Sequence, residues 1–267
     1  MSKIEILGVK VDALNMASII ANVKALLEDG QQHYFCTPNP EIILAALKDA
    51  EYKAILNNAD IQTADGAGLL WASEFLHEKN LHDKKRRKTS TALMKIFTPT
   101  KCKSIIPERV TGVDLTKQIC KLTEALNKKV FLLGANEGVA QKTKENLNSI
   151  YPQLKIVGTF SGSPKPSDEA KIIEMINSSG AEILFVAYGA PAQEKWIARN
   201  LVKMPSVRLA GGVGGTFDFI AGTKKRAPKW MQNIGIEWLY RVIIQPSRIK
   251  RIFNATIKFP FVVLRSK

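Results

Sequence analysis

Cysteine and long apolar runs are scarce in this sequence. The three cysteines, Cys36, Cys102 and Cys120, form no Cys-x-x-Cys pair and leave an odd thiol, which excludes a disulfide-stapled secreted domain and favours reduced thiols. No stretch approaches the roughly 18–20 apolar residues that a membrane-spanning helix needs. The first residues also lack the apolar segment of a signal peptide. We therefore expect the protein in the cytoplasm.

Several motifs that identify enzyme classes are missing as well. The three histidines form no His-Glu-x-x-His set, and no Gly-x-Ser-x-Gly motif is present, which argues against a metallohydrolase and a hydrolytic triad. The absence of Gly-x-Gly-x-x-Gly argues against a nicotinamide-dependent oxidoreductase. No Asp-x-Asp pair is available to hold a divalent metal on a diphosphate, so arginines and helix N-termini would have to neutralise such a group. We expect no cofactor and no divalent metal.

The composition is that of a soluble domain with an excess of positive charge. The 267 residues are 45% hydrophobic and 24% charged, which is enough for one large α/β domain. The net charge of +15 is uneven, because Gly222–Lys267 has eleven basic residues against one acidic residue and His77–Lys103 has nine against two. Basic segments of this kind attract nucleic acid, phospholipid headgroups or a diphosphate.

Short apolar runs alternate with amphipathic segments along most of the chain. This alternation is typical of an α/β fold with a largely parallel sheet covered by helices on both faces. The segment Glu74–Pro107 breaks the pattern, and we interpret it as a basic insertion, either a solvated loop or an excursion with a short helix at Ala92–Phe97. The predicted strands are His33–Thr37, Asp60–Ala64, Lys129–Leu133, Leu154–Thr159, Glu182–Ala187 and Val207–Ala210, and the predicted helices are Ser18–Leu27, Glu41–Lys48, Asp114–Leu126, Gly138–Ile150, Asp168–Asn177 and Ala192–Lys203.

The last part of the chain has a basic amphipathic pattern. We predict a helix that starts at Pro228 and runs through Val242, followed after Pro246 by a segment in which basic and apolar residues alternate. Two interpretations remain open. The segment is either a surface helix whose arginines meet phosphate at a membrane, or an ordinary C-terminal helix packed on the core.

Candidate site residues follow the predicted strands, because ligands of an open parallel sheet bind beyond the carboxyl ends of its strands. Thr37 is followed by Asn39, which suits a helix N-cap whose electropositive helix start faces a phosphate or a sugar hydroxyl, although a plain cap would look the same. Asp65, followed by Gly66, is a candidate general base or a cap. The glycine-rich run Gly211–Thr216 permits a tight turn or the close approach of a ligand.

Six segments, in this order, resemble the WecG/TagA/CpsF family of bacterial glycosyltransferases. Together they span nearly the whole chain except the basic insertion, which is longer than the family pattern leads us to expect. The segments are Thr37–Glu41, Ala59–Gly66, Pro107–Asp114, Gly189–Trp196, Gly212–Phe219 and Ala221–Trp230, the last of which runs into Glu237–Arg241 and Gln245–Arg248.

The resemblance implies a Rossmann-like catalytic core over residues 1–221 and a membrane-associating appendage over residues 222–267. It further implies an inverting, metal-independent transferase that moves a hexose, N-acetylmannosamine in the teichoic-acid branch, from a UDP-sugar donor to undecaprenyl-diphosphate-linked N-acetylglucosamine. Other branches use a different UDP-hexose in capsule or exopolysaccharide assembly. The implied partners are the polyprenyl-diphosphate acceptor, the anionic inner face of the cell membrane, on which the enzyme is peripheral, and further copies of the chain in a homo-trimer.

The resemblance also implies roles for individual residues. Asp65 matches the catalytic base, and Thr37 and Asn39 match pocket residues beside it. The positions that match substrate-binding residues are Arg109 and Gln193, together with the arginines that engage the lipid diphosphate, Arg241, Arg248 and Arg251.

Two interpretations outside this enzyme class account for part of the pattern. A nucleic-acid-binding protein would explain the net charge, but the basic residues are interleaved with Trp230, Trp238 and Phe253, and no helix-turn-helix, zinc-finger or RNP motif is present. We therefore expect no nucleic acid partner. A non-catalytic membrane scaffold of the same fold would keep the basic tail without turnover.

Overall fold

The computed structural model describes residues 3–80, 105–225, 227–228, 231, 240 and 249–266. Some of the sequence predictions lie outside these residues. They are Cys102, the short helix at Ala92–Phe97, the two arginines Arg241 and Arg248, and most of the helix predicted from Pro228 to Val242.

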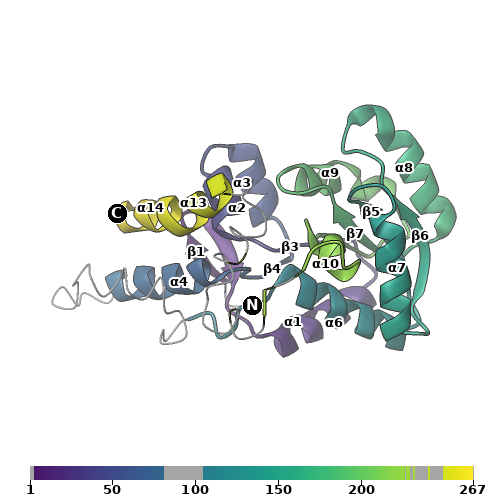
Figure 1. Cartoon of the computed structure of the whole chain (residues 1–267), viewed down its shortest axis with the longest axis horizontal. Coiled ribbons are helices and arrows are strands. Elements are labelled where there is room, and N and C mark those ends of the chain that lie inside the picture. Colours follow the sequence, from purple (N-terminus) through teal and green to yellow (C-terminus); the bar gives the residue numbers. More distant parts are fainter. Residues whose placement is uncertain are drawn as a thin grey trace.

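A six-stranded parallel sheet forms the centre of the molecule, which confirms the predicted fold class (Figure 1). Its strand order is β4-β3-β8-β7-β5-β6. All six strands were predicted, and the boundaries of β4 and β8 differ most from the prediction. The strands are β3 (His33–Cys36), β4 (Ile61–Gln62), β5 (Lys129–Gly134), β6 (Lys155–Phe160), β7 (Ile183–Ala187) and β8 (Leu209–Gly212).

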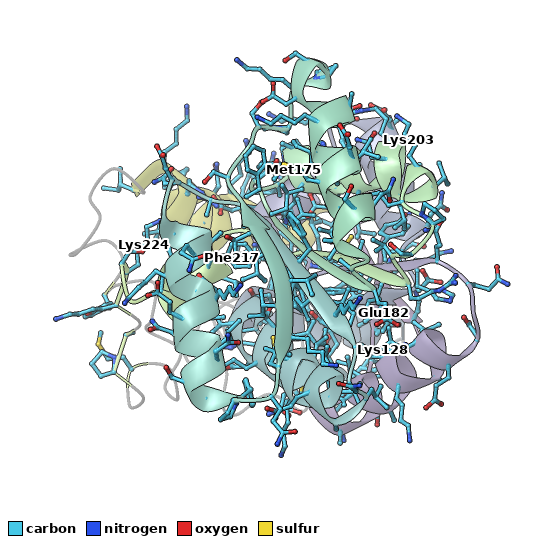
Figure 2. All side chains as sticks on the ribbon, turned by 90° about the vertical axis from the view of Figure 1, so that its right-hand side faces the viewer. Lys128, Met175, Glu182, Lys203, Phe217 and Lys224 are labelled. Carbon is cyan, nitrogen blue, oxygen red and sulfur yellow. The ribbon has the colours of Figure 1, made fainter. Side chains whose placement is uncertain are left out.

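Helices cover both faces of this sheet. One face packs on α1, α6, α7 and α10, and the other packs on α8 and α9. Viewed from the side of β6, α7 and α8 lie to either side of this edge strand (Figure 2). The helices are α1 (Met16–Glu28), α2 (Pro40–Ala46), α3 (Ala50–Asn57), α4 (Ala67–Asn80), α6 (Gly112–Ala125), α7 (Val139–Ile150), α8 (Pro166–Ser179), α9 (Ala192–Asn200), the 3-10 helix η3 (Leu201–Lys203) and α10 (Thr216–Ile220).

The strands divide their side chains between the two layers because successive residues of a strand point to opposite faces. In β5, Val130 and Leu132 join the core with α1 and α6, whereas Phe131 and Leu133 join the core with α8 and α9. At the amino ends of the strands, Lys128 lies beside Glu182, with Nζ 2.7 Å from Oε1 (Figure 2).

Polar caps begin several of the helices. The side chain of Asn15 accepts a hydrogen bond from Ser18 N at the start of α1, and Thr111 accepts one from Asp114 N at the start of α6. Asn39 caps α2, and Pro40 occupies its first turn, as the sequence predicts. Such caps satisfy backbone N–H groups that have no partner within the helix.

The N-terminal hairpin was not predicted. Strands β1 (Lys3–Ile6) and β2 (Val9–Asp12) pair antiparallel and lie beside β4, the edge strand of the main sheet. The carboxylate of Asp12 accepts a hydrogen bond from Gln62 N at 2.6 Å. The hairpin therefore supplies an acceptor to an edge strand that would otherwise leave backbone donors unpaired.

The first residues of the predicted basic insertion lie in a helix. Glu74 lies within α4, which continues to Asn80, so the first part of the segment assigned to an irregular excursion is helical. Trp71 is buried and stacks on Phe75, with ring centroids 5.4 Å apart. Packing of these rings accounts for the helix before the charge run at Lys84–Lys88, which lies outside the described residues.

The described end of the chain is helical and packs on the core. It comprises α13 (Ile249–Phe253), the π-helical turn η5 (Asn254–Lys258) and α14 (Phe259–Arg265). Phe259 and Val263 are fully buried in the hydrophobic cluster that also contains α2 and α4. Helix α14 lies alongside α4 (Figure 1). Among the described residues, no helix is both long enough and apolar enough to span a membrane. The two described cysteines, Cys36 and Cys120, are free and buried.

Candidate active site

A cleft of about 430 Å³ lies at the carboxyl ends of the central strands. Its walls come from the segments that follow β3, β4, β7 and β8, from the start of α6, and from the C-terminal helix. This is where parallel α/β sheets bind their ligands, and the volume lies within the range of small-molecule sites. The polar and charged residues that line it are Thr37, Asn39, Glu41, Asp65, Thr111, Gln193, Thr216, Arg251 and Asn254.

Asp65 is half-buried on the floor of this cleft. Its backbone N–H donates to Pro38 O at 2.8 Å, which ties it to the loop after β3. One carboxylate oxygen, Oδ2, lies 3.5 Å from Gly112 N at the start of α6. Gly66 follows with a φ of +122°, a conformation that glycine adopts far more readily than other residues. Asp65 is thus one of two carboxylates that line the cleft, and Glu41, the other, is paired with Arg251.

Two hydroxyl groups gather around the start of α6. A methyl group placed on Gly112 would lie 3.2 Å from Thr216 Oγ1 and 3.7 Å from Thr37 Oγ1. Gly112 therefore lets both threonines approach the N-terminal end of a 14-residue helix, where the helix dipole favours negative charge. This part of the cleft suits an anionic or hydroxyl-rich ligand.

Asn39 acts mainly as a cap. Its Oδ1 accepts hydrogen bonds from Glu41 N and Ile42 N, both at 3.0 Å, so this oxygen is engaged at the start of α2. By capping α2, Asn39 fixes the first turn of this helix beside the cleft.

Gln193 joins two loops of the cleft wall. Its Oε1 accepts from Gly189 N at 3.1 Å and from Gly214 N at 2.9 Å, and these glycines follow the neighbouring strands β7 and β8. Only 1% of Gln193 is exposed, so most of its side chain is held inside the wall.

The C-terminal helix brings an arginine to the cleft. Arg251 makes a bidentate ion pair with Glu41 at the start of α2, with Nη2 2.8 Å from Oε2 and Nε 3.1 Å from both carboxylate oxygens. Asn254, one turn later, also lines the cleft. The cationic tail thus borders the same space as Asp65.

The cleft brings together five of the eight predicted site residues: Thr37, Asn39, Asp65, Gln193 and Arg251. Arg109 is half-buried just before α6 and is not one of the lining residues, and Arg241 and Arg248 lie outside the described residues. Within the described ranges, no three His, Cys, Asp or Glu side chains are placed to hold a metal ion.

Sequence reasoning missed several lining residues. Gly214 and Thr216 had a signal in the glycine-rich run that follows β8, and Gly112 lies in one of the family-like segments. Glu41 also lies in a family-like segment, whereas Asn254 had no such signal, because its place in the cleft depends on how the C-terminal helix docks.

The sequence model of the glycosyl transferase WecG/TagA/CpsF family matches residues 4–99 and 95–267. Two relatives are named N-acetylglucosaminyldiphosphoundecaprenol N-acetyl-beta-D-mannosaminyltransferase. The one from Bacillus subtilis (strain 168) is 28% identical over 261 residues, which cover 95% of this chain and 90% of the relative. The one from Staphylococcus aureus (strain MRSA252) is 29% identical over 268 residues, which cover 100% of this chain and 94% of the relative.

Proposed function

Because this chain belongs to the WecG/TagA/CpsF family and is a glycosyltransferase, we propose that it transfers N-acetylmannosamine from a UDP-linked donor to undecaprenyl-diphosphate-linked N-acetylglucosamine. The full-length similarity to transferases named for this acceptor and this sugar supports the proposal. The observation that carries it is the cleft in which Asp65, two threonine hydroxyls and Arg251 border one space at the carboxyl end of the sheet.

The proposed chemistry is a direct displacement with inversion at the anomeric carbon. The carboxylate of Asp65 takes the proton from the acceptor hydroxyl as the hydroxyl oxygen attacks from the face opposite UDP. The bond to the UDP oxygen breaks, and UDP leaves with the electron pair. General-base assistance of this kind is worth about 10²–10⁴-fold in rate.

The charge that develops on the leaving diphosphate needs a partner in the cleft. Electropositive groups at the cleft include the N-terminal end of α6 and the guanidinium of Arg251, which would exchange part of its pairing with Glu41 for the diphosphate. The sequence has no Asp-x-Asp pair. We therefore propose that the reaction proceeds without a divalent metal.

The C-terminal helix supports a membrane-facing role. Its outward face carries Ile249, Phe253, Ile257 and Phe261, which are 62%, 55%, 50% and 49% exposed and recur every four residues. Lys250, Lys258 and Arg265 accompany them on the same helix. An apolar stripe with basic neighbours is the pattern of a helix that lies in the interface of an anionic membrane, where a polyprenyl acceptor resides.

The experiment that tests the reaction is UDP release from a panel of UDP-sugars, with a short-chain polyprenyl-diphosphate-N-acetylglucosamine acceptor and EDTA present. We expect acceptor-dependent release with UDP-N-acetylmannosamine that EDTA does not reduce. Release with another UDP-hexose would contradict the proposed donor and keep the reaction class. Loss of release in EDTA would contradict the metal-free mechanism.

Replacing Asp65 by asparagine tests the proposed base. Asp65→Asn keeps the shape of the side chain but removes the proton acceptor, so kcat should fall by about 10²–10⁴-fold with little change in the KM for the donor. Asp168→Asn, at the start of α8 and not among the cleft residues, is the matched control and should keep wild-type turnover. Wild-type kcat in Asp65→Asn would remove Asp65 from this role.

A further inference from the structure

We propose that Glu194 is a positioning residue that fixes the amide of Gln193, and through it the two glycine loops that form one wall of the cleft. The inference deepens the proposed function and rests on it, because it concerns the same cleft. Glu194 follows Gln193 on α9 and is completely buried.

The contacts form a chain from the cleft wall into the core. Gln193 Nε2 donates to Glu194 Oε1 at 2.7 Å, while Gln193 Oε1 accepts from Gly189 N and Gly214 N. Glu194 Oε2 accepts from the hydroxyl of Tyr52 on α3 at 3.1 Å. Tyr52 is also completely buried. Along this chain from the two loops to α3, every hydrogen-bond donor therefore meets an acceptor.

The orientation of the Gln193 side chain matters because its amide oxygen accepts hydrogen bonds whereas its NH₂ group donates them. Gly189 N and Gly214 N are both donors, so the side chain of Gln193 must turn its oxygen toward them. Its NH₂ group then faces Glu194, and a carboxylate accepts that hydrogen bond without being able to donate one. A carboxylate at position 194 therefore favours the amide orientation that holds both loops.

The core around Gln193 and Glu194 leaves space for both side chains. A methyl group on Gly212 would lie 2.7 Å from Gln193 Nε2 and 2.9 Å from Glu194 Oε1, so a glycine at the end of β8 leaves the room that the pair occupies. Burial raises the pKa of Glu194, and the hydrogen bonds from Gln193 and Tyr52 oppose that shift. Burial of a carboxyl group is costly unless hydrogen bonds compensate it, and here one comes from Gln193, which lines the cleft, and one from Tyr52 on α3.

The test compares Glu194→Leu, which removes both acceptor oxygens at similar size, with Glu194→Gln, whose amide oxygen still accepts from Gln193. The control is Ile172→Ala, a buried position of α8 in the apolar cluster that also holds Trp196 and Ile197 of α9, which lowers stability without removing a polar group of the pair. Two readouts are measured on the full chain: the kinetics of UDP release, and deuterium exchange of the peptides that contain the amides of Gly189 and Gly214.

Glu194→Leu should raise the donor KM, lower kcat/KM by about tenfold or more, and speed exchange in both peptides. Ile172→Ala should keep both readouts near wild type, and Glu194→Gln, which keeps one acceptor oxygen but adds a donor, should lie between wild type and Glu194→Leu. Wild-type kinetics and exchange in Glu194→Leu would overturn the proposal. Equal damage in Glu194→Gln or in Ile172→Ala would also overturn it, since Glu194 would then serve stability alone.

Tyr52→Phe provides a second test if the leucine variant does not fold. It removes only the hydroxyl that donates to Glu194, so a smaller shift of both readouts in the same direction is expected, and no shift contradicts the proposal. The exchange readout needs no substrate. A wild-type protein that releases no UDP would therefore refute the proposed function while the positioning role is still measured.

Discussion

At the scale of single residues, Gly211 shows how closely the central strands pack. A methyl group at this position in β8 would overlap the ring of Phe35 on the neighbouring strand β3. Phe35 is itself held edge-on against Phe185, with ring centroids 6.3 Å apart and planes at 72°. The ring therefore has little freedom to give way.

Gly211→Ala should lower the free energy of unfolding by about 1–3 kcal/mol through overpacking. Urea denaturation followed by far-UV circular dichroism measures the change. Gly215→Ala is a control from the same glycine-rich run, because its φ is −77° and the nearest atom to an added methyl group, Asp218 Oδ2, is 3.7 Å away. If both substitutions cost the same, contact with Phe35 is not the cause.

His33 makes the stability of the chain depend on pH. Its Nε2 lies 2.9 Å from Asp29 Oδ2, and its Nδ1 lies 3.0 Å from Asp60 Oδ1. Burial by itself would lower the pKa of His33, but hydrogen bonds to Asp60 and Asp29 outweigh it, and the pKa is raised above its ordinary value. The folded chain therefore binds this proton more tightly than the unfolded chain does.

Because the pKa of His33 is higher in the folded chain, protonation of His33 stabilises the fold. This stabilisation is fully present below the unfolded-chain pKa of about 6.5 and is lost as the pH rises through the folded-chain pKa. Comparing the wild type with His33→Gln by urea denaturation, we expect the difference in unfolding free energy to be largest near about pH 6 and to shrink toward about pH 9. A difference that stays constant over this range would show that the charge of His33 contributes nothing.

At the scale of secondary-structure elements, the C-terminal helix has one face buried against the core and one face exposed. Phe259 and Val263 pack against α2 and α4, whereas Phe253, Ile257 and Phe261 are exposed. Packing on the core, one of the two interpretations left open by the sequence, is confirmed for the buried face, whereas a membrane-facing role for the exposed face stays a prediction.

Replacing the exposed Phe253 and Phe261 by serine should weaken binding to vesicles that contain anionic phospholipid by about tenfold or more, because less apolar area is available for burial. Vesicle co-sedimentation measures the effect. Val202→Ser is the control, since Val202 is 77% exposed on η3, away from the basic helix. Equal binding by the double variant and the wild type would contradict a membrane role for this face.

At the scale of the whole molecule, the two ends of the chain belong to one hydrophobic cluster. The β1–β2 hairpin packs on α4, and α4 packs on α14. The cleft shares this construction, because Arg251 reaches Glu41 across 210 residues of sequence. The described part of the C-terminal segment therefore contributes both to the hydrophobic core and to the wall of the cleft.

Phe259→Ala should lower the free energy of unfolding of the entire chain by about 3–5 kcal/mol, as expected for a fully buried phenylalanine. Phe261→Ala, two residues later and half-exposed, should change it by less than about 0.5 kcal/mol. Thermal or urea unfolding of the two variants measures the contrast. A small effect of Phe259→Ala would mean that the tail is separable from the core.

Much of the fold follows from local sequence patterns. The alternation of apolar runs predicts six strands and most of the helices between them, because strand and helix periods are visible over a few residues. The N-terminal hairpin and helices α3, α4 and α10 were not predicted. The hairpin is local, but its two strands are only four residues long, too short for a clear alternating pattern. Asp65 was a candidate base or cap because a carboxylate at a strand end is a local feature, and the family resemblance favoured the base.

The class of fold, the basic tail, the base candidate and the family resemblance all follow from short segments of the sequence. Three contacts become visible only once the chain is folded: Gly112 N lies 3.5 Å from Asp65 Oδ2, Arg251 pairs with Glu41, and Tyr52 donates a hydrogen bond to Glu194. These contacts join residues 47, 210 and 142 positions apart. They depend on how helices and strands pack, and no local period or capping pattern records which distant side chains will meet.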